Sequence, residues 1–413
     1  MSANPEALVP GIGRAALDAL LERFGEGSVS ASARYDALAR YEEMPARVTV
    51  RGGRGWKHDL TKLDLSGVPA FSLGGVQLSL ESLSVEARNK GVTIEHFAHA
   101  RERHRIAFDR AFGKAVDTRD DKFASLALAF ANEGVFIDIP AGVSLDEPLL
   151  IGYEAREAAM FPYTVVSLGE GARATLVERI ATIDGAPLVC GIVELVIGAN
   201  AVLTYGVDQR ASDGTRLIMT RRAIVGKDAA LAVAFAELGG MHAVSRFRAV
   251  EPAPGARVET VALFFSDRTQ HVDIETETIH AAGNTQSQTI VRSAGTDKGQ
   301  GRYLGNIKIL AAAHGADASL RDDALLLSEG SHIDSVPALE IAANDVKAFH
   351  GATVGAISEE ELFYAQSRGI AREDAERMIA LGFFEPAVSR FPTESLRAEI
   401  RTALERKLRS RPA

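Results

Sequence analysis

The sequence predicts a mainly β protein: a β-helix, or solenoid, flanked by N-terminal and C-terminal α-helical regions. Glycines recur at a nearly constant interval through the middle of the 413-residue chain, and short runs rich in Val, Ile, Leu and Thr separate them. Helical periodicity is concentrated towards the two ends. We therefore divide the chain into an N-terminal helical region at residues 1–122, a β-helix core at 123–355 and a C-terminal helical region at 356–413.

The N-terminal region is predicted to hold short helices with irregular connections. One helix is indicated by four apolar residues at helical spacing: Leu17, Leu20, Leu21 and Phe24. A second helix is expected over residues 31–43, because Pro45 follows. A glycine-rich break at residues 51–55 precedes the single tryptophan, Trp56, and the polar segment 95–121 suggests further helix at the surface.

Six glycines in the middle region each close one strand-like run and open another: Gly171, Gly198, Gly226, Gly255, Gly283 and Gly315. Their spacings are 27, 28, 29, 28 and 32 residues. A period of this length with two strands per unit is typical of a solenoid, in which stacked units share one core because no unit can bury its apolar face alone. A β-sandwich is the alternative, but it needs hairpin turn signals, which are few in this sequence.

The C-terminal region is predicted to form three helices with clear start and stop signals. Ser358 and Glu361 have the spacing of a capping box, and the helix that they open is expected to end at residues 368–369. A second helix is expected over residues 372–381, with Gly382 as its C-terminal cap.

Thr393 can cap the third helix, whose apolar side chains form one stripe: Leu396, Ile400, Ala403, Leu404 and Leu408. Basic residues occupy the opposite face. Such a terminal helix either covers the end of the solenoid or offers a docking surface to a partner protein. The sequence alone leaves both interpretations open.

Composition excludes several classes of function. Hydrophobic residues make up 46% of the chain and charged residues 24%, so a large core can form. The net charge of −9, with no long basic run, argues against a nucleic-acid surface. The sequence shows no secretion signal and no apolar stretch long enough to span a membrane, so we expect a cytoplasmic protein.

Few residues point to catalysis or to a metal site within the chain. The single cysteine, Cys190, lies in an apolar strand-like run, where cysteine usually acts as a small buried hydrophobe. One cysteine excludes a disulfide within the chain and a four-thiolate metal site. No phosphate loop, nucleophile elbow or zinc-protease motif is present, so we expect no enzyme activity.

Two acidic clusters have simple structural interpretations. Asp322 and Asp323 could form a catalytic pair on a solenoid face, as in β-helical carbohydrate-active enzymes, but neighbouring acids more often form a solvated turn. The glutamates at 359–361 suit a helix start, where negative charge is favourable.

Histidine is the remaining metal-binding residue type, and most of the ten histidines are interpreted as structural or solvated. These are the arginine-rich set His96, His99 and His104, and the solenoid set His271, His280, His314 and His332. His350 differs, because it lies where the solenoid meets the tail, and Gly351 and Gly355 allow a close approach of backbone or partner. A structural and a functional role both remain open for it.

Several segments together resemble one known family. The most specific lie in the last quarter of the chain: residues 325–328, 337–341, 344–347, 350–355, 361–364 and 367–370. Residues 134–148 resemble the same family's entry into its β-helix, and residues 56–60 resemble its N-terminal tryptophan motif. The family is SufB/SufD, whose members assemble iron–sulfur clusters.

The resemblance implies a right-handed parallel β-helix between helical ends, and a scaffold role in a complex with a SufB-like paralogue and a SufC-like ATPase. The single cysteine and the block 350–355 resemble the SufD branch. By this resemblance His350 faces a partner cysteine and binds a transient iron–sulfur cluster shared between the two chains. The ATPase is expected to dock on the C-terminal helices, through Leu362, Phe363, Leu396, Ile400 and Leu404.

One position departs from the family pattern. Many relatives have a cysteine two residues before this histidine, where the present chain has Ala348, so the thiolates must come from the partner. A homodimer is an alternative when the chain is alone, and a SufB-like homodimeric scaffold is a further one, disfavoured by the lack of cysteines. A β-helical carbohydrate-active enzyme is disfavoured because aromatic residues make up only 6% of the chain and its one Trp lies outside the repeats.

Overall fold

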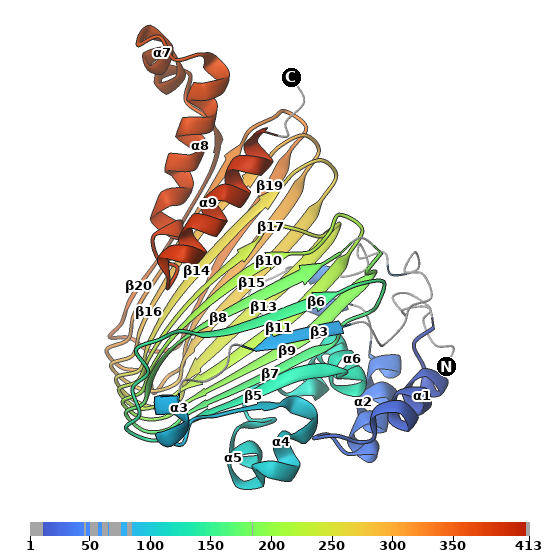
Figure 1. The fold of residues 1–413 in the computed structure, drawn as a ribbon. Helices are drawn as coiled ribbons and strands as arrows, with labels where there is room; N and C mark the ends of the chain where they lie inside the picture. Colours follow the sequence, from blue (N-terminus) through green and yellow to red (C-terminus); the bar gives the residue numbers. More distant parts are fainter. Residues whose placement is uncertain are drawn as a thin grey trace.

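The protein is a parallel β-solenoid with helices at both ends (Figure 1), as the repeats predict. This computed structural model describes residues 11–44, 47–49, 57–59, 65, 76–80, 85–183 and 185–409. Strands account for 44% of the structure and helices for 26%, and the described part of the solenoid has about eight turns. The glycine-rich break at 51–55 and Trp56 lie outside the described residues.

The N-terminal region is mainly helical, with short strands between its helices. Its elements are α1 (Arg14–Phe24), α2 (Ala31–Glu43), β1 (Arg47–Thr49), β2 (Lys57–Asp59), β3 (Val76–Leu80), α3 (Val85–Asn89), β4 (Thr93–His96), α4 (Phe97–Arg103), α5 (Arg105–Ala111), the 3₁₀ turn η2 (Thr118–Asp120) and α6 (Lys122–Phe130). The first two helices match the predicted ones. The expected start of the strands at residue 123 is too early, because Asp121 caps α6 by accepting from Phe123 N and Ala124 N, both at 2.9 Å.

Within the described residues, the solenoid strands form two nine-stranded sheets. The first contains β3, β6 (Leu149–Ala155), β8 (Arg173–Thr182), β10 (Val202–Arg210), β12 (Ala230–Glu237), β14 (Arg257–Ser266), β16 (Gln286–Gly295), β18 (Asp317–Leu326) and β20 (Lys347–Ala356). The second contains β4, β5 (Glu133–Ile139), β7 (Pro162–Leu168), β9 (Leu188–Ile197), β11 (Arg216–Val225), β13 (His242–Glu251), β15 (His271–His280), β17 (Gln300–Ile309) and β19 (His332–Ile341). All pairings are parallel except those of β3 and β4, which are antiparallel at the N-terminal end.

The length of the predicted repeat equals the number of residues in one solenoid turn. Val202 pairs with Ala230, Ala230 with Arg257, and Arg257 with Gln286, so equivalent residues recur after 28, 27 and 29 positions. The corner glycines serve two purposes. Gly255 adopts a φ of +73°, whereas a Cβ at Gly198 would lie 2.7 Å from the Leu168 carbonyl of the preceding turn.

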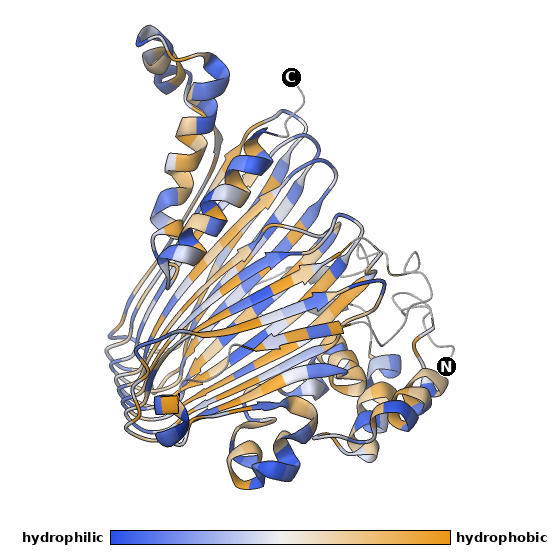
Figure 2. Ribbon diagram, viewed as in Figure 1, coloured by the Kyte–Doolittle hydropathy of each residue, from blue (hydrophilic) through white to orange (hydrophobic). Residues whose placement is uncertain are grey.

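The terminal helices cover opposite outer faces of the solenoid. Buried residues of α6 pack with Cys190, Ile218 and Val244 on the second sheet. The C-terminal helices α8 (Arg372–Val388) and α9 (Glu394–Arg409) pack on the first sheet, against Val261 and Phe265 among others. Hydrophobic residues run along most of the strands between these layers (Figure 2). The core therefore has three parts: the solenoid interior and one helical layer on each side.

Two details of the C-terminal helices differ from prediction. At the start of α7 (Glu359–Ser367), the Ser358 side chain makes no capping hydrogen bond to a described residue, so the capping box is absent. Helix α8 continues past Gly382 to Val388, because Phe384, Ala387 and Val388 are buried against the first sheet and this packing outweighs the helix-ending tendency of glycine. By contrast, Thr393 caps α9 as predicted, accepting from Leu396 N at 3.2 Å.

Candidate functional site

The C-terminal end of the solenoid is its open end. Strands β19 and β20 are the last members of the two sheets, and no further described strand pairs with their outer edges. Three large apolar side chains on this last turn are exposed: Ile341 at 45%, Phe349 at 61% and Val354 at 43%. At the other end, by contrast, β3 and β4 flank the first turn, and Ala87 of α3 is buried in the solenoid core.

His350 lies on this open end and faces the solenoid axis. It is in register with Leu320, whose side chain belongs to the interior core. Since register partners in a parallel sheet point to the same face, His350 points inward as well. It is nevertheless exposed, because β20 ends the sheet. Among the described residues no hydrogen bond or ion pair holds its ring, so the imidazole can bind an incoming ligand.

The predicted acid pair is divided between two faces of β18. Asp322 points into the solenoid and accepts a hydrogen bond from Ser335, and burial raises the pKa of its carboxyl to about 7. Asp323 points outward, where it bonds to Arg292 and Arg321. Two carboxyls on opposite faces of a strand cannot act on one substrate, so the arrangement of a glycosidase is absent here. Neither acid lies in a solvated turn.

Cys190 is a buried structural residue, as the sequence indicates. It is 1% exposed under α6, and its Sγ lies 3.4 Å from the Phe123 carbonyl oxygen. Burial raises the pKa of the thiol, which therefore stays protonated. Cys190 belongs to β9 of the second sheet, whereas His350 belongs to β20 of the first. The two residues do not form one site.

Several other histidines have structural partners. His280 is fully buried, with Nδ1 2.7 Å from Glu251 Oε2. The exposed pairs His314–Asp345 and His332–Asp334 have N–O distances of 2.7 and 2.9 Å. His96 and His104 lie near two different glutamates, Glu133 and Glu95, and the hydrogen bond to Glu133 raises the pKa of His96.

The structure brings together one cluster that the sequence interpretation missed. His242 Nε2 lies 3.3 Å from Asp273 Oδ2, and His271 Nε2 lies 3.1 Å from Asp273 Oδ1. Burial lowers the pKa of His242 and alone would raise that of Asp273, but the two histidines and Arg302 hold the pKa of Asp273 well below its usual range. The signal was present in the sequence: His242 and His271 are 29 residues apart, one solenoid turn, and Asp273 is two residues further on the same strand face.

The predicted docking residues differ in solvent exposure. Leu396, Ile400 and Leu404 are buried against the first sheet, so this stripe is not available as a free surface. The physical reason is that the sheet's outer face is itself apolar there. Leu362 is buried against Ala365 and other residues of α7 and α8, whereas Phe363 is 73% exposed.

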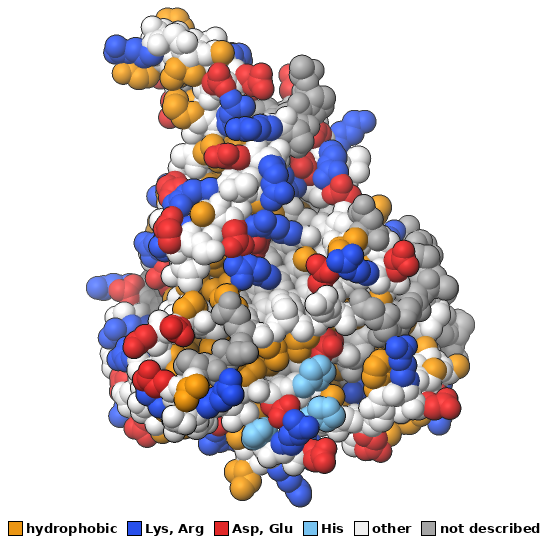
Figure 3. All heavy atoms as spheres, in the orientation of Figure 1, with side chains coloured by type: hydrophobic (Ala, Val, Ile, Leu, Met, Phe, Trp, Pro, Cys, Tyr) orange, Lys and Arg blue, Asp and Glu red, His pale blue; other side chains and the backbone are white. Residues whose placement is uncertain are grey.

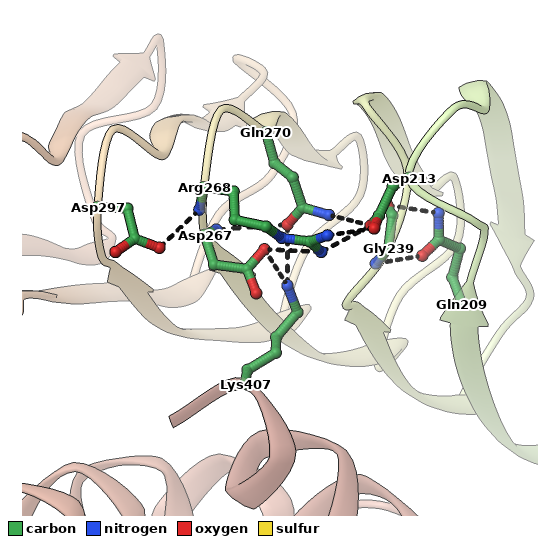
Figure 4. Close-up of polar contacts among 8 residues, drawn as sticks. All are labelled: Gln209, Asp213, Gly239, Asp267, Arg268, Gln270, Asp297 and Lys407. Carbon is green, nitrogen blue, oxygen red and sulfur yellow. Dashed lines mark hydrogen bonds and ion pairs between the residues drawn. The ribbon is translucent and has the colours of Figure 1, made fainter. Parts of the chain in front are cut away.

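Helix α9 is also fixed at its last turn. Lys407 points from α9 towards the turn that carries Asp267 and Gln270 (Figure 4). Its Nζ lies 3.0 Å from Asp267 Oδ1 and donates to Gln270 Oε1 at 2.8 Å. Asp213, in the connection between β10 and β11, accepts from Arg268 Nη2 at 2.7 Å. The largely buried Lys407–Asp267 pair ties the last turn of α9 to the solenoid.

The surface around these helices is highly charged. Figure 3 shows Lys and Arg side chains interspersed with Asp and Glu over α8 and α9, and hydrophobic side chains on α7. Tyr364 and Met378 join Phe363 as exposed apolar residues of α7 and α8, at 63% and 51%. The free apolar surface of the C-terminal region therefore lies at α7 and the start of α8.

The fold and the open end define a class: a helix-flanked parallel β-solenoid with a histidine at an unpaired terminal edge. Residues 151–383, more than half of the chain, match the family model for the SUF system FeS cluster assembly, SufBD core domain. The chain belongs to the SufB/SufD family of iron–sulfur cluster assembly proteins.

Curated relatives agree with this assignment. The chain is 28% identical over 364 residues to iron-sulfur cluster assembly SufBD family proteins of Staphylococcus saprophyticus, Staphylococcus epidermidis and Staphylococcus aureus. Each alignment covers 86% of this chain and 77% of the relative. In the part of the chain that the structure describes, no helix is both long and apolar enough to cross a membrane.

Proposed function

We propose that this chain is a SufD-type scaffold subunit of the cytoplasm, without catalytic activity of its own. It pairs through its open end with a SufB-like paralogue and recruits a SufC-like ATPase through its C-terminal helices. His350 contributes one ligand to an iron–sulfur cluster that assembles transiently between the two solenoids. The observation that carries this proposal is the position of the exposed His350 on an unpaired terminal strand, where it faces the interior that a second solenoid would continue.

The open end suits a partner of the same architecture. The outer edges of β19 and β20 present backbone N–H and C=O groups that another strand can pair with. Exposed Ile341, Phe349 and Val354 supply apolar contact area next to these edges. A homodimer would use the same surface, so the paralogue and a second copy compete for it.

The chemistry requires that the partner supply thiolates. Iron–sulfur clusters are held mainly by cysteine, with histidine as an occasional replacement. Cys190 is buried with a raised pKa, and Ala348 stands where many relatives have a cysteine. A neutral imidazole holds iron less firmly than a thiolate does, and an assembly site must release its cluster. A mixed site with one histidine serves that need.

The ATPase contact is proposed for α7 and the start of α8. Phe363 is the exposed member of the predicted docking set, and Tyr364 and Met378 extend the same surface. Leu362 supports α7 from beneath. The α9 stripe has a different task in this proposal, because it holds the helical layer against the sheet.

The test compares wild type with His350→Ala after co-expression with the SufB-like and SufC-like partners and anaerobic purification. We expect the variant to form the complex but to lose most of its bound iron and acid-labile sulfide, because no hydrogen bond or ion pair ties the His350 ring to a described residue of its own chain. His332→Ala is the matched control: it removes another exposed histidine from the last turn, on β19, and should keep the cluster.

Two outcomes would count against the proposal. Equal iron and sulfide in the wild type and in His350→Ala would assign the histidine to structure alone. Failure of the wild-type chain to associate with either partner would refute the SufD-type scaffold role. Loss of iron in both His350→Ala and His332→Ala would indicate general damage to the last turn.

A further inference from the structure

A second group of metal-binding side chains lies on the outer face of the second sheet. His242 begins β13, and His271 and Asp273 lie at the start of the neighbouring strand β15. The register pairs His242 directly with His271. Ala243 and Val272, the next residues on each strand, face the interior core, so the two histidines and Asp273 share the outward side.

The donor atoms of the three side chains lie close together. Their donor atoms all lie within 4.8 Å of one another, and the two imidazole rings stack with centroids 4.5 Å apart. His271 Nε2 lies 3.1 Å from Asp273 Oδ1 and His242 Nε2 lies 3.3 Å from Oδ2, so the two histidines approach different oxygens of one carboxylate. For comparison, ligand atoms at the corners of a tetrahedron with metal bonds of 2.0–2.1 Å stand about 3.3 Å apart.

We propose that His242, His271 and Asp273 bind one divalent transition-metal ion. Two imidazoles and one carboxylate form a donor set that suits Fe²⁺, Zn²⁺ or Co²⁺ and disfavours Mg²⁺ and Ca²⁺, which prefer oxygen ligands. To bind the ion, each imidazole must present an unprotonated Nε2 and carry its one ring proton on Nδ1. A proton held on Nε2 therefore moves to Nδ1 or, if the ring carries two protons, is released to water. Water completes the coordination from the side on which His271 is exposed.

Arg302 on β17 shapes this site. Its Nε lies 3.0 Å from Asp273 Oδ1, and its Nη2 donates to Oδ2 at 3.1 Å. The guanidinium fixes the orientation of the carboxylate, as hydrogen-bonded outer residues commonly do at metal sites. Its positive charge also opposes the incoming cation, so the bound ion exchanges readily.

The exposed His332–Asp334 pair shows how this cluster differs from an ordinary ion pair. His332 and Asp334 on β19 have the same His-x-Asp spacing, and their N–O distance is 2.9 Å. That pair is exposed and has no second histidine among the described residues. A second, buried imidazole beside the carboxylate is not needed for an ion pair, whereas it is needed for a three-ligand site. If the proposed scaffold function holds, the physiological ion is ferrous iron held for delivery; the binding site itself does not depend on that function.

The experiment uses the full chain alone, freed of metal and kept anaerobic. Co²⁺ serves as the spectroscopic probe, and Fe²⁺, Zn²⁺ and Mg²⁺ are added separately, with bound metal measured after equilibrium dialysis. We expect wild type and the control His332→Ala to bind one equivalent of Co²⁺, Zn²⁺ or Fe²⁺ and no Mg²⁺. His271→Ala and Asp273→Asn should weaken binding by roughly 100-fold or more, since loss of an outer residue alone costs about 10- to 100-fold.

The possible results are distinct. Equal Co²⁺ or Zn²⁺ binding by wild type and His271→Ala, or no binding by wild type, overturns the site. Circular dichroism melting checks that the variants fold, and the partly exposed His271 makes its substitution the safer of the two histidine variants. Zn²⁺ uptake without Fe²⁺ uptake overturns only the iron assignment. His350→Ala should bind the ion normally, so this site and the proposed cluster site can fail independently.

Discussion

At the scale of single residues, the solenoid interior contains charged side chains as well as apolar ones. Arg221 and Glu237 are fully buried and lie 3.1 Å apart. Glu178 accepts hydrogen bonds from Thr164 and Tyr205, and burial raises its pKa. Buried charges are costly unless they are paired and hydrogen-bonded, and these groups satisfy that condition in part.

Asp322 near the open end gives a pH-dependent prediction. Burial raises its pKa to about 7 from an ordinary value of 3.8, so the folded state holds a proton that the unfolded state releases between these pH values. Its contribution to stability is complete below about pH 4 and is lost as the pH rises through 7. At about 1.4 kcal/mol per pKa unit, the loss reaches roughly 4 kcal/mol. We therefore expect Asp322→Asn to stabilise the chain at pH 8 by more than at pH 5.

Urea unfolding of the full chain at the two pH values measures this effect. Asp323→Asn is the control, because Asp323 faces outward and is paired with two arginines. It should not reproduce the pH-dependent gain. A stability difference between wild type and Asp322→Asn that is the same at pH 5 and pH 8 would contradict the shifted titration.

At the scale of elements, sequence patterns predict a helix boundary correctly where interactions within the segment determine that boundary. Helix α2 has the predicted bounds because its apolar periodicity and the following proline act on the segment itself. Helix α8 runs past Gly382 because its later residues are held by the distant strands β14 and β16, which no local pattern reveals. The same limitation applies to the α9 stripe: its residues were identified correctly, but whether they face a sheet or a partner depends on the tertiary fold.

The candidate site residues likewise fall into those that the sequence identifies and those that only the tertiary structure brings together. The family resemblance singled out His350, and the solenoid period was sufficient to suggest an end of the stack near it. The grouping of His242 with His271 and Asp273 needs the register of β13 with β15. That register follows from the repeat only once the strand boundaries are known. Each histidine taken alone therefore gives no sign of a shared site.

Two glycines test the role of the helical layer. Gly382 is exposed within α8, and a Cβ there would meet no atom within 4 Å outside the helix backbone. Gly382→Ala should stabilise the protein by about 0.5–1 kcal/mol, the usual gain over glycine in a helix interior. Gly206→Ala should destabilise it instead, because the new Cβ would lie 2.6 Å from Pro392 Cγ and 2.7 Å from Leu396 Cδ2.

Chemical denaturation gives the two stabilities, and hydrogen exchange of α9 shows whether the helix has lifted from the sheet. Faster exchange in α9 is expected for Gly206→Ala and not for Gly382→Ala. If Gly382→Ala destabilised the chain, α8 would have to end near residue 381 in solution.

At the scale of the whole molecule, helices cover part of both outer faces of the solenoid, and two antiparallel strands flank its first turn. The N-terminal helices lie on the second sheet, α8 and α9 lie on the first, and β3 and β4 flank the first turn (Figure 1). Among the described residues, the last turn and helix α7 are two parts that carry exposed large apolar side chains. A stack of identical turns gives no physical reason to stop at β20 unless helices or another chain cover the final edge.

The exposed apolar residues of this last turn therefore give the final prediction. The double variant Ile341→Glu/Phe349→Glu places two negative charges at the open end, one on each sheet. Its effect on the stability of the isolated chain should be small, within about 0.5 kcal/mol per site, because the two side chains are already 45% and 61% exposed. Its association with the SufB-like partner should weaken by at least 100-fold, since buried unpaired charge is strongly unfavourable at an interface.

Sedimentation velocity of the mixed chains measures this association, with Met378→Glu on α8 as the control for an exposed apolar residue away from the open end. Unchanged pairing with the variant would mean that the partner binds elsewhere, and that the solenoid end is closed in some other way.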